Sequence, residues 1–302
     1  MCYDYRRMNR DLEILDENFN IIESFTIGDS LMDKQIPCVR IGQGKTKILL
    51  AGAFHGLEYL TSAFLVKFLS ELIVHIMTRQ KLFGYDTERI FSEASIYVVP
   101  MVNPDGVDIA IHGIDITNPY HRALISMVGI HSFNRVWQSN ARGVDLNHNY
   151  DAKWSMVIDK PSPTKYGGKY PESEPETRAV AELIRRENFD MLLTYHSQGK
   201  EIYYDFDGME NKRAFEVAKK MAEESGYEVC KPEGTAAFGG CKDWFIKEYG
   251  RLGFTVEIGS GQNPLPMSML DDIYEENAKL TLCAVEEAIK DKAVNKKTEM
   301  LS

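Results

Sequence analysis

The sequence predicts an α/β fold in which helices cover both faces of a β-sheet. Short apolar runs alternate along the chain with longer amphipathic segments, and this alternation is typical of α/β proteins. The short runs have the composition of buried strands, which is expected when a sheet is covered on both sides. No fixed repeat, low-complexity tract or Pro/Ser-rich linker divides the 302 residues, so we expect one domain.

The predicted strands are the short apolar runs. They are KILLAGAF (47–54), ASIYVVPMV (94–102), FDMLLTYHS (189–197) and FTVEIG (254–259). The second run is expected to stop at a turn, NPDG (103–106). Helices are predicted where apolar residues recur every three to four positions, over 61–77, 173–188, 213–226 and 274–293. Ser173 is the expected N-cap of the second of these helices, and Gly226 is expected to end the third.

Composition and charge argue against several functional classes. The formal net charge is −10, whereas proteins that bind nucleic acids or anionic membranes normally carry a basic patch. No uninterrupted apolar run approaches the length of a membrane span, so we expect no membrane insertion. The first 20 residues lack the apolar core of a secretory signal. The five cysteines include no C-x-x-C pair; we interpret them as free thiols and expect a cytoplasmic protein.

Chemically capable side chains follow the ends of the predicted strands. His55 and Glu58 come after the first strand, His196 lies at the end of the third, and Glu257 lies inside the fourth. The carboxyl ends of strands in open α/β sheets are where ligands bind. Two histidines and one carboxylate are a ligand set of catalytic zinc, and a further carboxylate can serve as general base. For His55 and Glu58 alone, a polar turn before a helix is the alternative interpretation.

Other candidate motifs are weaker. GQGKTK (42–47) resembles part of a phosphate-binding loop, but it lacks the upstream glycine and precedes a strand, so we expect a hairpin turn there. Cys241 is expected to be a small buried thiol. Four further histidines are not expected to be ligands. His75 lies in a predicted helix and is expected to pack or to face solvent. His112, His121 and His131 lie in a loop-rich stretch (108–141) and are expected to be surface or cleft residues.

Five spaced motifs resemble those of the zinc carboxypeptidases of the carboxypeptidase A type. They are FHGLE (54–58), NPDGV (103–107), RGVDLNHNY (142–150), YHSQG (195–199) and FTVEIG (254–259). The stretches SEPETRAV, YHSQGKEIYY, GGCKDWF and IGSGQNPLP are similar to the bacterial branch that cleaves γ-D-glutamyl–diamino-acid bonds in cell-wall peptides. The resemblance implies a single-domain α/β/α sandwich over 1–302, with a mixed, mostly parallel sheet of about eight strands. It further implies N-terminal strands over 1–45 and a catalytic core over 46–293.

The resemblance also implies a role for each matching residue. His55, Glu58 and His196 would hold one zinc ion per chain. Glu257 would be the general base that activates the attacking water and passes its proton to the leaving amine. Asp145 would hydrogen-bond a ligand histidine, which fixes the ring tautomer and raises the basicity of the ligand.

The residues expected to face the substrate depart from the family pattern in two places. Asn147 would contact the substrate carboxylate, and Arg142, or alternatively Arg135, would stabilise the oxyanion. His148 stands where an arginine usually follows Asp-Leu-Asn, and an imidazole cannot make the same bidentate pair with a C-terminal carboxylate. We therefore expect His148 to bind substrate and to disfavour ordinary peptide C-termini. Phe238 lies in the stretch (234–244) where the family has a tyrosine over the substrate, so no residue is assigned to that role.

These observations favour a zinc metallopeptidase. Its expected substrate is a peptide, and specifically a cell-wall muropeptide cleaved at a γ-D-glutamyl–diamino-acid bond. The alternatives are a metallocarboxypeptidase of ordinary peptides and a deacylase or amidohydrolase on the same zinc scaffold, because a fold does not determine function. A binding protein without catalysis is disfavoured, since the three ligands and the base are all present.

Overall fold

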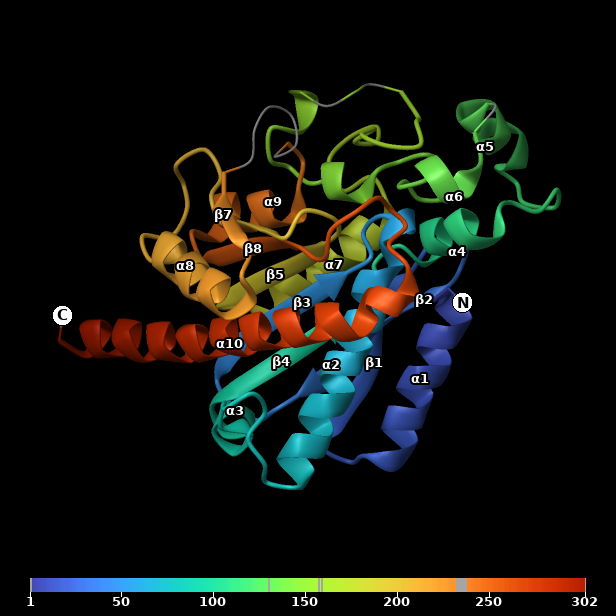
Figure 1. Ribbon diagram of the computed structural model, residues 1–302. Coiled ribbons are helices and arrows are strands. Elements are labelled where there is room, and N and C mark those ends of the chain that lie inside the picture. Colours follow the sequence, from blue (N-terminus) through green and yellow to red (C-terminus); the bar gives the residue numbers. More distant parts are fainter. Residues whose placement is uncertain (1, 130, 157, 159, 232–237, 302) are drawn as a thin grey trace.

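An eight-stranded mixed sheet forms the centre of the protein (Figure 1). The computed structural model describes residues 2–129, 131–156, 158, 160–231 and 238–301. The strands lie in the order β1-β2-β4-β3-β5-β8-β6-β7. Their bounds are β1 Ile22–Asp29, β2 Gln35–Ile41, β3 Thr46–Gly52, β4 Ala94–Val99, β5 Met191–His196, β6 Glu201–Tyr203, β7 Glu228–Cys230 and β8 Leu252–Glu257.

The middle of the sheet is parallel and its edges are antiparallel. Strands β4, β3, β5 and β8 run in one direction as neighbours. On one side β2 and β1 add antiparallel strands, and on the other side β6 pairs antiparallel with β8 while β7 runs parallel to β6. The four strands predicted from apolar runs are the four central ones, because burial on both faces makes their sequences continuously apolar.

Helices connect the strands and cover the sheet. Their bounds are α1 Tyr5–Asn18, α2 Tyr59–Met77, α3 Thr87–Glu93, α4 Pro104–His112, α5 His121–Val128, α6 Phe133–Val136, α7 Pro175–Glu187, α8 Ala214–Ser225, α9 Cys241–Tyr249 and α10 Leu270–Leu301. Single 3-10 turns add η1 Gly56–Glu58, η2 Leu146–His148, η3 Trp154–Met156 and η5 Met267–Met269.

Each face of the sheet has its own hydrophobic core. Residues of α1, α2, α8 and α10 pack with Ile48 and Leu50 of β3, and residues of α7 and α9 pack with Leu49 and Ala51 of the same strand. Successive side chains of a strand point to opposite faces, so neighbouring residues of β3 enter different cores. The arrangement is the expected α/β/α sandwich, and Figure 1 shows α10, α2 and α1 together on one side of the sheet.

The N-terminal segment differs from the prediction of strands over 1–45. It begins with helix α1, and only then come β1 and β2. The side chain of Asp4 accepts from the backbone N–H of Arg7 and caps the helix. Met8, Leu12 and Leu15 are its buried residues. Their three-to-four spacing is the helical signal that the strand prediction overlooked.

Four local predictions near turns also differ from the structure. NPDG is not a turn but the start of α4, because Pro104 occupies the first helical position and Asn103 caps the helix by accepting from Gly106 N–H. The stretch 108–141, expected to be loop-rich, contains α5 and α6. Residues 42–45 do not form a hairpin, since β4 lies between β2 and β3. The N-cap of α7 is Glu174, one residue after the expected Ser173.

Helix α2 is more apolar than the lengths of the uninterrupted apolar runs in the sequence indicated. Gly56–Met77 is long and apolar enough, by length and composition alone, to cross a membrane. Lys67 and Glu71 interrupt the apolar run in the sequence without lowering its mean hydropathy below that of a span. Within the protein, 61% of the most apolar window is buried. Phe64, Phe68 and Leu69 belong to the core against the sheet, so the packing of a core helix accounts for this composition.

Candidate metal centre

The loop after β3 is held rigidly by contacts with three other parts of the chain. The backbone N–H of Ala53 donates to the hydroxyl of Thr61 on α2 at 2.8 Å. The N–H of Gly56 donates to the carbonyl of Gln138 at 3.0 Å. A Cβ at position 56 would lie 2.3 Å from the carbonyl oxygen of Gly106, so only glycine fits this approach. The loop therefore presents its two chemically capable side chains in one fixed direction.

Strands β5 and β8 bring two further residues to the same edge of the sheet. His196 and Glu257 are direct partners in the parallel register of β5 and β8. The N–H of Ile258 donates to the carbonyl of His196 at 2.8 Å, which continues the ladder past both residues. The ring of His196 also stacks on Phe54, with ring centroids 5.4 Å apart and planes 21° apart. The ladder and the stacking together fix the direction of the imidazole.

The three expected ligands converge on one point. Glu58 lies with one oxygen 2.9 Å from His55 Nδ1 and the other 3.0 Å from His196 Nδ1. The two Nδ1 atoms are 3.3 Å apart. Donors of a tetrahedral zinc site, each about 2.0–2.1 Å from the ion, are separated by roughly 3.3 Å. The three residues form a group whose spacing fits a metal ion, and we call them the metal-binding group.

Asp145 decides which nitrogen of His55 is free to bind a metal. Its Oδ1 lies 3.1 Å from His55 Nε2. A carboxylate can only accept, so with a metal ion bound at Nδ1, the nitrogen that faces Glu58, Asp145 would keep the remaining proton of His55 on Nε2. Asp145 is itself held by the N–H of Lys165, which donates to its Oδ2 at 2.8 Å. The contact expected between Asp145 and a ligand histidine is therefore present.

The charges in and around the metal-binding group favour the binding of a cation. Burial alone would raise the pKa of Glu58, but His55 and His196 lower that pKa to about 2. Burial would lower the pKa of His55, and the carboxylates of Glu58 and Asp145 outweigh it and raise that pKa well above its usual value. Converging nitrogen lone pairs and carboxylate oxygens are the donor set of zinc, so the residues present fit this ion.

Glu257 has the environment of a proton-transfer group. Burial, and then the negative charge of Glu58, raise the pKa of Glu257 well above its ordinary value. A carboxyl group with a raised pKa binds a proton more readily than an ordinary carboxylate, which suits a group that takes and returns a proton. Its antiparallel partner on β6 is Glu201, whose carboxylate accepts from the hydroxyl of Tyr203 at 2.5 Å. Sequence reasoning missed Glu201, because the register of a three-residue edge strand leaves no periodic signal.

The arginines expected near the oxyanion have other surroundings. The Nε of Arg142 donates to a carboxylate oxygen of Glu174 at 2.8 Å, and its side chain is 39% exposed. Among the contacts of the described residues, none joins Arg142 to the metal-binding group or to Glu257. Arg135 is exposed on α6. The oxyanion role of either arginine stays a prediction that these contacts do not support.

Asn147 and His148 are bound mainly to the protein. The Oδ1 of Asn147 accepts from the backbone N–H of Cys241 at the start of α9, at 3.1 Å. His148 is buried, and its Nδ1–H donates to the carbonyl of Phe238 at 2.5 Å. Its Nε2 lies 4.0 Å from Asp145 Oδ2. Residues 234–237 of the stretch around Phe238 lie outside the described residues. The two side chains expected to bind substrate therefore fasten η2 to the segment that precedes α9.

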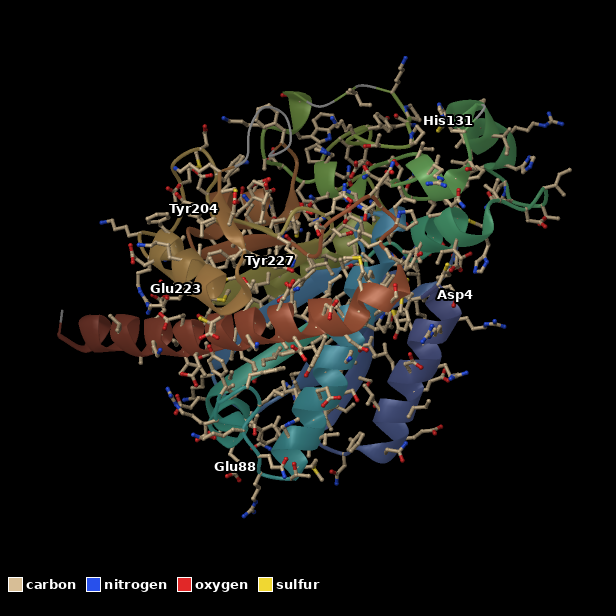
Figure 2. The ribbon with its side chains drawn as sticks, viewed as in Figure 1. Asp4, Glu88, His131, Tyr204, Glu223 and Tyr227 are labelled. Atoms are coloured by element: carbon tan, nitrogen blue, oxygen red, sulfur yellow. The ribbon has the colours of Figure 1, made fainter. Side chains whose placement is uncertain are left out.

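The remaining histidines lie elsewhere, as expected. His75 Nδ1–H donates to the carbonyl of Glu71 within α2. His112 contacts Asp4 at 3.0 Å. His131 is exposed beside α5, where Figure 2 labels it. Cys241 is buried, as expected of a small packing thiol. One further buried cation, Lys242, lies in the first turn of α9 and donates to the carbonyl of Asp205 at 2.7 Å.

Comparison with known proteins identifies the family. Residues 9–280 match the family of zinc carboxypeptidases, peptidase family M14. The chain belongs to this family. Zinc carboxypeptidases are hydrolytic metallopeptidases that use one zinc ion, and the metal-binding group described above is positioned to hold it.

Individual relatives agree with this assignment. Gamma-D-glutamyl-L-diamino acid endopeptidase 1 of Lysinibacillus sphaericus is 34% identical over 278 residues, which cover 91% of this chain and 70% of that protein. Carboxypeptidase B of Bos taurus is 25% identical over 297 residues, which cover 87% of this chain and 65% of that protein. Among solved structures, the chain superposes on bovine thrombin-activatable fibrinolysis inhibitor, in complex with tick carboxypeptidase inhibitor, with a TM-score of 0.77 at 20% identity. The superposition covers 96% of this chain and 98% of that chain. The last comparison confirms the predicted carboxypeptidase A-like fold.

Proposed function

We propose that this zinc metallopeptidase hydrolyses the bond between a γ-D-glutamyl residue and a diamino acid in cell-wall peptides. The observation that carries the proposal is the similarity to the Lysinibacillus endopeptidase, which extends over 91% of the chain at 34% identity. The stretches that follow β5 and β8, YHSQGKEIYY and IGSGQNPLP, also resemble that branch of the family. Relatives named carboxypeptidase B are less similar, at 25–26% identity.

The chemistry rests on four side chains at the carboxyl edge of the sheet. His55, Glu58 and His196 would hold the metal, and zinc bound there would supply a Lewis acid for the scissile carbonyl and for water. Glu257 takes a proton from the attacking water and gives it to the nitrogen of the leaving amine. Its position opposite His196 in the β5–β8 register places it beside the metal-binding group.

The surroundings of His148 and Arg142 favour an internal bond over a C-terminal residue. A carboxypeptidase holds the free carboxylate of its substrate, for which a bidentate arginine is best suited. Here the ring of His148 donates to the carbonyl of Phe238, and Arg142 pairs with Glu174. The Nδ1–H of His148 and the Nε–H of Arg142 are therefore already engaged within the protein, which supports a substrate that is recognised elsewhere.

Product analysis with matched peptides tests this proposal. The zinc-loaded protein is incubated with a γ-D-glutamyl–diaminopimelate peptide, its α-L-glutamyl isomer, and a simple peptide with an aromatic C-terminus, and products are identified by mass. We expect cleavage of the first peptide only, at the γ-D-glutamyl bond. A version with an amidated C-terminus should be cleaved equally well, because no terminal carboxylate is required.

Glu257→Gln protein is the control for contaminating activity. Release of the C-terminal residue from the simple peptide, together with resistance of the amidated peptides, would overturn the proposal in favour of an ordinary metallocarboxypeptidase. Release of an N-acyl group, with the peptide bonds of all three peptides intact, would favour a deacylase on the same scaffold.

A further inference from the structure

The loop formed by residues 140–149 (the 140–149 loop) carries Asp145, and so it sets the position of the group that orients His55. The loop has little regular structure, since the 3-10 turn η2 is its only element. Backbone hydrogen bonds hold its middle, among them the N–H of Asp145 to the carbonyl of Tyr166 at 2.8 Å. Side chains bind its two ends. Both ends bind the same short segment, Ser173 and Glu174, immediately before α7.

The first end of the loop is bound through Asn140. Its Nδ2 donates to a carboxylate oxygen of Glu174 at 2.7 Å. Its Oδ1 accepts from the backbone N–H groups of Arg142 and Val144, both at 3.1 Å. The backbone of Asn140 and Val144 is joined as well, by an N–H···O bond of 2.8 Å. One amide side chain therefore closes the turn that leads directly into Asp145.

The second end of the loop is bound through Asn149. Its Oδ1 accepts from the backbone N–H of Glu174 at 3.2 Å, and its Nδ2 donates to the hydroxyl of Ser173 at 3.0 Å. That hydroxyl in turn donates to the other carboxylate oxygen of Glu174 at 2.7 Å. Asn149 is fully buried, like Asn140. Glu174 thus connects the two ends of the loop through its two oxygens.

Glu174 is a buried carboxylate with donors on both of its oxygens. It is 2% exposed, and besides the two contacts above it accepts from Arg142 Nε at 2.8 Å. A buried charge is stable only when it is paired and fully hydrogen-bonded, so these donors are constrained to stay in place around it. We propose that Glu174 is a positioning residue that acts through Asn140 and Asn149 to hold Asp145 against His55, and thereby sets the affinity of the metal site.

The test measures zinc affinity, so it does not depend on the identity of the substrate, although the peptide proposed above would provide an activity check. The zinc dissociation constant of the purified full chain is determined by competition with a chromophoric chelator. Glu174→Ala should weaken zinc binding about 10- to 100-fold, as changes to the hydrogen-bond partners of metal ligands do. Glu174→Gln keeps the shape of the side chain and one oxygen that can accept from Asn140 and Arg142, while its amide N–H can donate to the hydroxyl of Ser173. It should therefore recover affinity to within a few-fold of wild type.

The matched control is Glu187→Ala at the opposite end of α7. Glu187 also accepts from a cation and a hydroxyl, Lys47 Nζ at 2.8 Å and Tyr97 at 2.9 Å. Its loss should lower stability and leave the zinc dissociation constant unchanged. If Glu187→Ala weakens zinc binding as much as Glu174→Ala, the effect is general destabilisation and the proposal fails.

A second variant covers the case in which Glu174→Ala does not fold. Asn140→Asp is isosteric and replaces the donor to Glu174 with an oxygen, so it should also weaken zinc binding at least 10-fold. In an Asp145→Ala background, Asn140→Asp should weaken binding no further, because the route through Asp145 is already cut. Wild-type zinc affinity in Asn140→Asp, or equal effects with and without Asp145, would overturn the proposal.

Discussion

The two sides of the metal centre are built in different ways. His55, His196 and Glu257 lie at or just past the carboxyl ends of β3, β5 and β8, three neighbouring parallel strands. Their positions follow from the backbone ladder of the sheet. The 140–149 loop has no ladder, and its shape depends on individual side chains such as Asn140 and Asn149. A ladder tolerates changes of side chain, whereas a loop of this kind is only as stable as each of its hydrogen bonds.

This difference implies that mutations on the two sides have separable effects. Changes to the strand-end residues should abolish metal binding or proton transfer while the fold survives. Changes to the loop should alter geometry, affinity and stability by smaller factors, and zinc should still bind.

Removal of a strand-end ligand should have the largest effect. His196→Ala leaves two of three protein ligands, so zinc affinity should fall by more than the roughly 10- to 100-fold typical of changes to residues that only orient a ligand. The β5–β8 ladder does not require the imidazole, and the fold should persist in far-UV circular dichroism. Metal analysis after dialysis checks this. A fully zinc-loaded His196→Ala protein would show that the ligand assignment is wrong.

Removal of the proton acceptor should spare the metal. Glu257→Gln keeps the shape of the side chain but cannot take a proton from water, so kcat should fall by roughly 10²–10⁴. Zinc content should remain near that of the wild type, because Glu257 is not one of the three converging ligands. Steady-state kinetics and metal analysis on the same preparation test both statements. Wild-type turnover would remove Glu257 from the mechanism.

The strand-end side was predictable from the sequence, whereas on the loop side only the contact of Asp145 with a ligand histidine was expected. His55, Glu58 and His196 follow apolar runs, and the period of a strand and the parallel sheet place such residues at one edge. The contact of His148 with Phe238, 90 residues away, leaves no periodic signal in the sequence. The same holds for Arg142, whose partner Glu174 lies 32 residues further along. Helix α1 is a different case: its spacing was readable, but the N-terminal segment was interpreted as strands.

A change at His148 tests the loop side directly. His148→Ala removes the donor to the carbonyl of Phe238, and a buried acceptor without its donor costs about 1–3 kcal/mol. We therefore expect kcat/KM to fall roughly tenfold with zinc content unchanged. His148→Asn places an amide N–H close to the position of Nδ1 and should restore most of the activity. If His148→Ala loses its zinc, the two sides are not separable.

The smallest effect concerns stability and pH, at a carboxyl group beneath the 140–149 loop. Glu176 is fully buried, and its Oε1 accepts from the backbone N–H of Leu31 at 3.0 Å. Burial, and then the charges of Asp105 and Glu174, raise the pKa of Glu176 from 4.5 to about 7. The protonated form is therefore favoured in the folded protein. Its contribution to stability is fully present below pH 4.5 and is lost as the pH rises through about 7.

Glu176→Gln mimics the protonated form at every pH and still offers an oxygen to Leu31. At pH 5 its free energy of unfolding should exceed that of the wild type by less than about 1 kcal/mol, and at pH 8 by up to roughly 3 kcal/mol. Glu187→Gln on the same helix supplies the opposite sign, since Lys47, Arg186 and Tyr97 outweigh burial and lower the pKa of Glu187 to about 2. That variant should be less stable than the wild type at both pH values.

Urea unfolding at pH 5 and 8 measures all three proteins. An equal difference between Glu176→Gln and the wild type at the two pH values would mean that Glu176 does not titrate between them, and the raised pKa of Glu176 would be wrong.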